Sequence, residues 1–136
     1  MSHICVFFET RNTTAELDCL GNSLSGFIPD ALSDLSSLQI LELGENFFSS
    51  SIPSSVGNLT ALASLSIYQN FLSGPFPSEL GQLVNLEILR LNNNQIAGGL
   101  PAELGNMIAL GKYRALFVIA SFASSLTTLT QSHCSL

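Results

Sequence analysis

The stretch LEILRLNNNQIAGGLP, residues 86–101, holds the pattern that determines the fold. Leu89 and Leu91 are two residues apart, so both side chains point to one face of a short strand. Pro101, which fixes φ and disfavours helix, follows the last asparagine by seven residues. The pattern occurs four times, and its asparagines are Asn22, Asn46, Asn70 and Asn94. Each step is 24 residues, as from Asn70 to Asn94, and a strict period of this length indicates stacked repeats rather than one globular core.

Apolar residues follow the same period. They lie eight, five and three residues before Asn46, Asn70 and Asn94, as in Leu62, Leu65 and Ile67. No single repeat can bury these side chains, so neighbouring repeats have to stack on one another. The asparagine amide carries donors and an acceptor that can bond backbone groups left unpaired by a turn. We therefore expect a buried structural ladder formed by Asn22, Asn46, Asn70 and Asn94.

The repeating unit, LxxLxLxxNxLxGxIPxxLGxLxx, resembles the leucine-rich repeat of the plant subtype. Repeats of this type occur in the ectodomains of receptor-like kinases and receptor-like proteins and in polygalacturonase inhibitors. The resemblance implies an α/β fold, a short curved right-handed solenoid of about four 24-residue repeats. It implies a parallel sheet on the concave face and 3₁₀ turns and loops on the convex side. We divide the chain into a ragged N-terminal segment (1–13), leucine-rich repeats (14–113) and an apolar Ser/Thr-rich tail (114–136).

Composition excludes several functional classes. The net charge is −6 with only four Lys and Arg, and a nucleic-acid surface needs a basic patch. The two histidines, His3 and His133, lie at opposite ends of the chain, so we expect no catalytic nucleophile–base pair, no metal site and no cofactor. The three cysteines, Cys5, Cys19 and Cys134, have no paired spacing. Cys19 occupies a core leucine position, so we predict a small buried hydrophobic residue there and no capping disulfide.

A partner is expected on the outward residues of the repeat strands. Four residues before the asparagines the outward column reads Asp18, Glu42, Ser66 and Arg90. Tyrosine and arginine are enriched at binding hot spots, and the alternative is an ordinary variable surface. The candidate partner-binding residues are Ile40, Glu42, Tyr68, Ile88, Arg90 and Asn92. Four short strands offer only roughly 250 Å², against about 800 Å² per partner in a standard interface.

The two ends depart from the repeat pattern. The apolar run near the start ends at Phe8, which is too short for a secretory signal. In the tail, strongly apolar sequence covers only residues 115–123, short of the roughly 20 residues of a membrane span. Three alternatives stay open for the tail: an apolar cap on the last repeat, translated intron sequence beginning near Lys112, or a membrane segment. Without recognisable caps, the ends are expected to favour self-association.

These observations favour a protein-interaction module over an enzyme. By resemblance, the chain is part of a plant receptor-like ectodomain with a role in signalling or defence, binding a peptide, a protein or another leucine-rich repeat ectodomain. Membrane association and an extracellular or plasma-membrane location rest on the resemblance alone. The alternatives are a secreted inhibitor of the polygalacturonase-inhibitor type and a non-functional truncated product. The sequons at Asn12 and Asn58 are interpreted as chance occurrences unless the chain is secreted.

Overall fold

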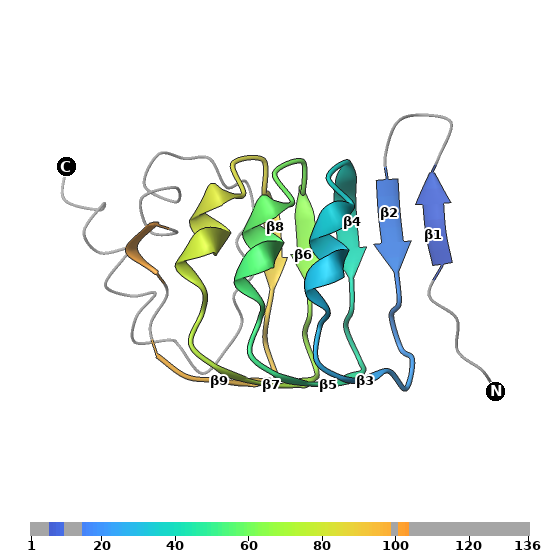
Figure 1. The fold of residues 1–136 in the computed structure, drawn as a ribbon. Helices are drawn as coiled ribbons and strands as arrows, with labels where there is room; N and C mark the ends of the chain where they lie inside the picture. The colour runs from blue at the N-terminus through green and yellow to red at the C-terminus, as the bar shows by residue number, and fades with distance from the viewer. Residues whose placement is uncertain (1–5, 10–14, 99–100, 104–136) are drawn as a thin grey trace, which may run out of the picture.

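The computed structural model describes residues 6–9, 15–98 and 101–103 and shows a stack of repeats (Figure 1). Each of four successive repeats contributes one strand to a parallel sheet in the order β2, β4, β6, β8. These strands are β2 (Ala15–Asp18), β4 (Leu38–Glu42), β6 (Ser64–Ser66) and β8 (Ile88–Arg90). Leu41 pairs with Leu65, and Leu65 with Leu89, so the 24-residue period of the sequence is also the register of the sheet.

Three short 3₁₀ helices lie side by side on the opposite side of the stack from this sheet (Figure 1). They are η1 (Asp30–Asp34), η2 (Ser54–Asn58) and η3 (Ser78–Gln82). A proline with extended backbone precedes each helix and sets its first turn: Pro29, Pro53 and Pro77. The predicted leucine-rich repeat solenoid, with parallel strands on one side and 3₁₀ turns on the other, is therefore confirmed.

The core fills the space between the sheet and the 3₁₀ helices. Its fully buried side chains come from the periodic apolar columns of the repeats that follow the first: Leu38, Leu41, Leu59, Leu62, Leu65, Ile67, Leu72, Leu80, Leu83, Leu86 and Leu89. The repeats approach closely on the helical side. A Cβ added at Gly57 would lie 2.5 Å from the backbone oxygen of Glu79 in the next repeat. Burial therefore depends on neighbouring repeats, as expected for a solenoid.

A second parallel sheet, which the sequence did not predict, follows the asparagine turns. Its strands are β3 (Ser25–Gly26), β5 (Phe47–Ser50), β7 (Phe71–Gly74) and β9 (Gln95–Ile96). They run along the lower margin of the stack in Figure 1. One inward apolar residue per repeat, such as Phe48 or Leu72, holds this sheet to the core. The alternate residues point outward, which places Phe47 and Phe71 on the surface.

Residues 6–9 of the N-terminal segment form a strand that the sequence did not predict. Strand β1 (Val6–Glu9) pairs antiparallel with β2 and covers the outer edge of the first repeat strand. Cys19 is buried, as predicted, but it is disulfide-bonded. The expectation of a simple hydrophobic residue without a disulfide is therefore wrong. No other cysteine lies in the described part of the chain. The tail at 114–136 and the sequon at Asn12 fall outside the described residues, and the domain boundaries remain predictions.

Candidate partner-binding surface

The asparagine turns fix the backbone beneath the outward strand residues. Nδ2 of Asn70 donates to the carbonyl oxygens of Ile67 (3.1 Å) and Tyr68 (3.1 Å) in its own repeat and of Leu43 (3.0 Å) in the preceding one. Its Oδ1 accepts a hydrogen bond from the backbone N–H of Phe48 at 2.9 Å. Asn46 and Asn94 make the equivalent contacts. Among the described residues, the side chain of Asn22 donates only to carbonyls of its own repeat. We propose that these bonds set the turns as a structural ladder.

One row of outward residues crosses the sheet from strand to strand. Asp18 pairs with Glu42, Glu42 with Ser66, and Ser66 with Arg90 in the strand register. Burial of the Glu42 carboxyl raises its pKa above the ordinary value. The side chain of Ser66, the backbone N–H of Gly44 and the charge of Arg90 oppose this rise, while the nearby charge of Asp18 adds to it. The row therefore holds a carboxylate that is partly desolvated and only partly compensated.

Ser66 differs from its expected place on the open surface. Its side chain is 1% exposed, although it belongs to the outward column. Its hydroxyl makes no hydrogen bond of good geometry with the described residues, yet it lies near enough to the Glu42 carboxyl to lower that group's pKa. The prediction that Ser66 lies on the open surface is therefore wrong. Its small side chain is buried because longer outward side chains, Glu42 on β4 and Arg90 on β8, flank it. A buried hydroxyl without a good partner costs free energy in the unbound protein.

Tyr68 extends this row toward the asparagine turns. A Cβ added at Gly44 would lie 2.5 Å from Cε1 of Tyr68 and 2.9 Å from Oε1 of Glu42, so the ring and the carboxyl meet above Gly44. The hydroxyl of Tyr68 donates to Oε1 of Glu45 at 3.1 Å. Burial, followed by this hydrogen bond, raises the pKa of the Tyr68 phenol above its ordinary value. Glu45 has a left-handed backbone, with φ of 56°.

The structure groups some of the predicted residues and separates others. Glu42 and Tyr68 lie together around Gly44, and Arg90 is exposed at the far end of the same row. Ile40 and Ile88 form a second row, separated by Ser64 in the register, and both are half-buried rather than exposed. Asn92, also half-buried, occupies the column of Tyr68 one repeat later. Its backbone carbonyl accepts a hydrogen bond from the N–H of Gln69 at 3.0 Å.

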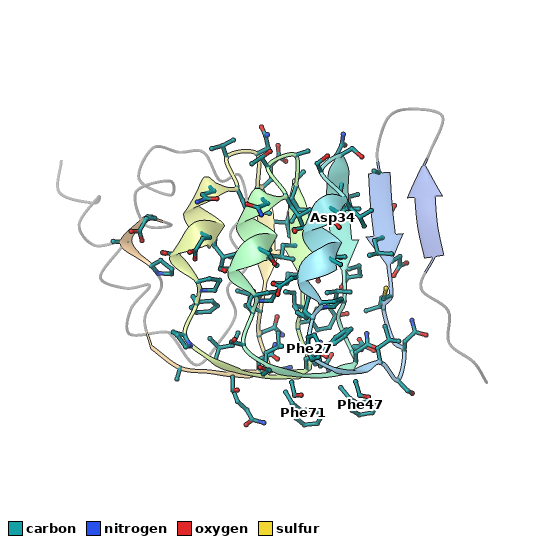
Figure 2. The ribbon with its side chains drawn as sticks, in the orientation of Figure 1. Phe27, Asp34, Phe47 and Phe71 are labelled. Carbon is teal, nitrogen blue, oxygen red and sulfur yellow. The ribbon has the colours of Figure 1, made fainter. Side chains whose placement is uncertain are left out.

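Two exposed phenylalanines form a feature that sequence reasoning missed. The rings of Phe47 and Phe71 are stacked with centroids 6.1 Å apart, and their side chains are 50% and 51% exposed. Figure 2 shows both projecting from the second sheet. They line a hollow of about 400 Å³ together with Glu45, Asn46, Gln69, Asn70 and Asn93. The sequence signal for this pair is an aromatic residue directly after the asparagine in two consecutive repeats.

The described residues carry little that would support other chemistry. Among them, no group of three or more His, Cys, Asp or Glu side chains is placed to hold a metal ion. In the same part of the chain, no helix has the length and apolar character needed to cross a bilayer. The side chain of Asn58, the acceptor of the second sequon, is exposed at the end of η2.

Comparison with known proteins supports the repeat assignment. The family model of the Leucine Rich Repeat matches residues 37–59 and 85–107. No match was found among curated protein sequences. The chain is similar to one chain of the BIR3–SERK2 complex from Arabidopsis thaliana, at 38% identity and a TM-score of 0.63, covering 65% of this chain and 48% of that one. It is also similar to the plant peptide hormone receptor RGFR1, in complex with RGF2, at 32% identity and a TM-score of 0.72, covering 79% and 17%.

A third similar structure shows that this fold alone does not determine function. A plant ice-binding protein matches at 33% identity and a TM-score of 0.65, covering 68% of this chain and 30% of that one. The chain spans less than half of each of these three solved chains. One fold thus serves different functions, and function has to be argued from the surface. The chain carries leucine-rich repeats and resembles part of the ectodomain of a plant leucine-rich repeat receptor kinase.

Proposed function

We propose that this chain is a protein-interaction module that binds a peptide or a protein ligand, in the manner of a receptor-like ectodomain, rather than an enzyme. The observation that carries this proposal is the continuity of two exposed surfaces. Glu45 accepts a hydrogen bond from Tyr68 on the strand face and also lines the hollow beside Phe47 and Phe71. The proposed binding surface therefore comprises Glu42, Glu45, Phe47, Tyr68, Phe71 and Arg90.

The chemistry of this surface is typical of an interface. It combines exposed aromatic rings with a few charged groups, and aromatic residues and arginine are enriched at binding hot spots. The stacked phenylalanines add area to the small strand face, which alone offers roughly 250 Å². Several relatives are solved with partners: HAESA with the peptide hormone IDA and the co-receptor SERK1, and RGFR1 with RGF2. A peptide, or another leucine-rich repeat ectodomain, is the corresponding partner class here.

Location outside the cell or at the plasma membrane belongs to the same proposal. Cys19 is disulfide-bonded, and disulfides persist mainly in oxidising compartments. The exposed sequon at Asn58 lies on the helical side of the stack, away from the strand face, so a glycan there would leave the binding surface open. A role in signalling or defence would follow from the receptor-like ectodomains that the chain resembles.

Selection of peptides on the intact chain tests the binding function. Random dodecapeptides are displayed and selected on the immobilised 136-residue protein, and the affinities of selected peptides are measured for Tyr68→Ala and Phe71→Ala. Loss of a hot-spot side chain should weaken binding by about tenfold or more. Val84→Ala is the control, because Val84 is also an exposed hydrophobic residue, at 53%, just after η3 and outside the proposed surface. Failure to select any peptide, or equal losses at Val84, would contradict the proposal.

Self-association is a second interaction that we infer from the ends of the stack. Strand β1 covers the outer edge of β2, but no described strand pairs with the outer edge of β8. Uncovered strand edges template further pairing. Sedimentation of the intact chain at micromolar concentrations should show oligomers, and a chain that stays monomeric would contradict this inference.

A further inference from the structure

We propose that Asp18, Glu42 and Ser66 seat a cationic side chain, lysine or arginine, of the peptide partner. This inference rests on the proposed binding function and names the chemical class that the strand face selects. It concerns one row of the sheet, across strands β2, β4 and β6, with Tyr68 beside it.

Negative charge is concentrated at this end of the strand face. Asp18 and Glu42 are direct partners in the register of β2 and β4, and like charges in such positions repel one another. The only basic residue in the row is Arg90, which lies two strands away from Glu42, beyond Ser66. Within the described residues, neither carboxylate has a cation at salt-bridge distance; Asp18 Oδ1 accepts from the N–H of Leu20 (2.9 Å) and Glu42 Oε1 from that of Gly44 (3.2 Å). A cation from a partner would relieve this repulsion.

The hydroxyl of Ser66 is an independent indication of a ligand. Only 1% of its side chain is exposed. The hydroxyl lowers the pKa of the Glu42 carboxyl as a hydrogen-bond donor does, but its oxygen accepts no hydrogen bond among the described residues. Ser66 pairs with Glu42 on one side and with Arg90 on the other in the strand register, so it lies directly beside the acidic end of the row. Buried polar groups are normally satisfied. An ammonium or guanidinium group held by Glu42 would present N–H donors to this oxygen.

The surrounding groups favour an organic cation over a metal ion. The ring of Tyr68 meets the Glu42 carboxyl above Gly44, and aromatic rings attract lysine and arginine side chains. The structure places no cluster of three or more metal-ligating side chains among its described residues. Arginine adds a planar fork of donors that fits two carboxylates, whereas lysine brings a compact charge.

The test uses the peptides selected on the intact chain. Lysine or arginine should recur at one position, and replacing that residue with uncharged norleucine or citrulline should weaken binding on the order of tenfold. Asp18→Asn together with Glu42→Gln should cause a similar loss. Both substitutions retain the oxygen that accepts the backbone hydrogen bond. The neutral peptide should then bind the double variant and the wild-type protein equally well.

Asp34→Asn provides the matched control. It removes one negative charge, half of what the double variant removes, from an exposed position on η1, on the helical side of the stack, as Figure 2 shows. This variant should bind the selected peptides within about twofold of the wild-type protein, because solvent screens distant surface charges. A loss equal to that of the double variant would show unspecific attraction and overturn the proposal.

The outcomes also separate this inference from the binding function. Selected peptides that lack lysine and arginine, and bind the wild-type and double variants equally, would overturn the cation seat and leave the binding function intact. No selected peptide of any composition would overturn both. Thermal melting of the variants excludes unfolding as the cause of lost binding. Replacing Glu42 by glutamine should not lower the melting temperature, since the charged form is disfavoured in the fold.

Discussion

Leu65 and Ser66 are neighbours on strand β6, and both are almost completely buried, on opposite faces of the sheet. Leu65 lies in the apolar core between repeats, with equivalents in Leu41 and Leu89. Ser66 lies on the outward face, where the equivalent residues are Glu42 and Arg90. The inward column keeps one chemistry because every repeat packs against the next. The outward column changes from acid to hydroxyl to base, and this variation can give the strand face a binding function.

The largest expected difference between the two faces is in stability. Leu65→Ala should lower the free energy of unfolding by about 2–5 kcal/mol, because the lost methyl and methylene groups leave a cavity in a packed core. Denaturant titration followed by circular dichroism measures this loss. A cost below that of outward substitutions on β6 would mean that the two faces had been assigned the wrong way round.

The asparagine turns should come next. Asn70→Ala should cost about 1–3 kcal/mol, because it removes bonds to the buried backbone around Leu43 and Phe48. Asn58→Ala is the control, since the Asn58 side chain is exposed at the end of η2 and should contribute little. Both variants can be compared in the same denaturant titrations. Equal costs would contradict the structural role of the asparagine column.

Substitution of Ser66 is expected to change the free energy of unfolding less, and in the stabilising direction. Ser66→Ala removes a buried hydroxyl that has no well-formed hydrogen bond among the described residues, so unfolding should be unchanged or slightly less favourable, within about 1 kcal/mol. Thermal and denaturant melts measure this change. A clear loss of stability would show that the hydroxyl stabilises the fold and is not kept for binding a partner.

The smallest expected effect is the pH dependence of stability that Glu42 contributes. The pKa of Glu42 is raised above 4.5 in the folded protein, mainly by burial. The folded state therefore favours the protonated form, and the stability it contributes is present below pH 4.5 and lost as pH rises through the folded pKa. Glu42→Gln should accordingly be at least as stable as the wild-type protein at pH 7, with the difference closing toward pH 4.5. Melting temperatures of the two proteins across this pH range provide the check. A difference in melting temperature that widens toward low pH would contradict the raised pKa of Glu42.

The sequence predicts the inward face well and the outward face only in part. Leucines such as Leu41 and Leu65 repeat with a fixed period, so their burial follows from the stacking that the period implies. The burial of Ser66 depends on the side chains that adjacent repeats place around it, which no single repeat encodes. The stacking of Phe47 on Phe71 likewise requires the register of a second sheet whose strands are too short to stand out in the sequence. The disulfide of Cys19 has no signature in cysteine spacing.

Hydrogen–deuterium exchange of the intact chain, free and bound to a selected peptide, tests most directly whether the strand face binds while the inward face supports the fold. We predict new protection in residues 40–47 and 64–71, which include the outward residues of β4 and β6 and the stacked phenylalanines. Residues 30–34, 54–58 and 78–82, the three 3₁₀ helices, should exchange as in the free protein. Protection confined to these helices would place the partner on the opposite side of the stack and contradict the account.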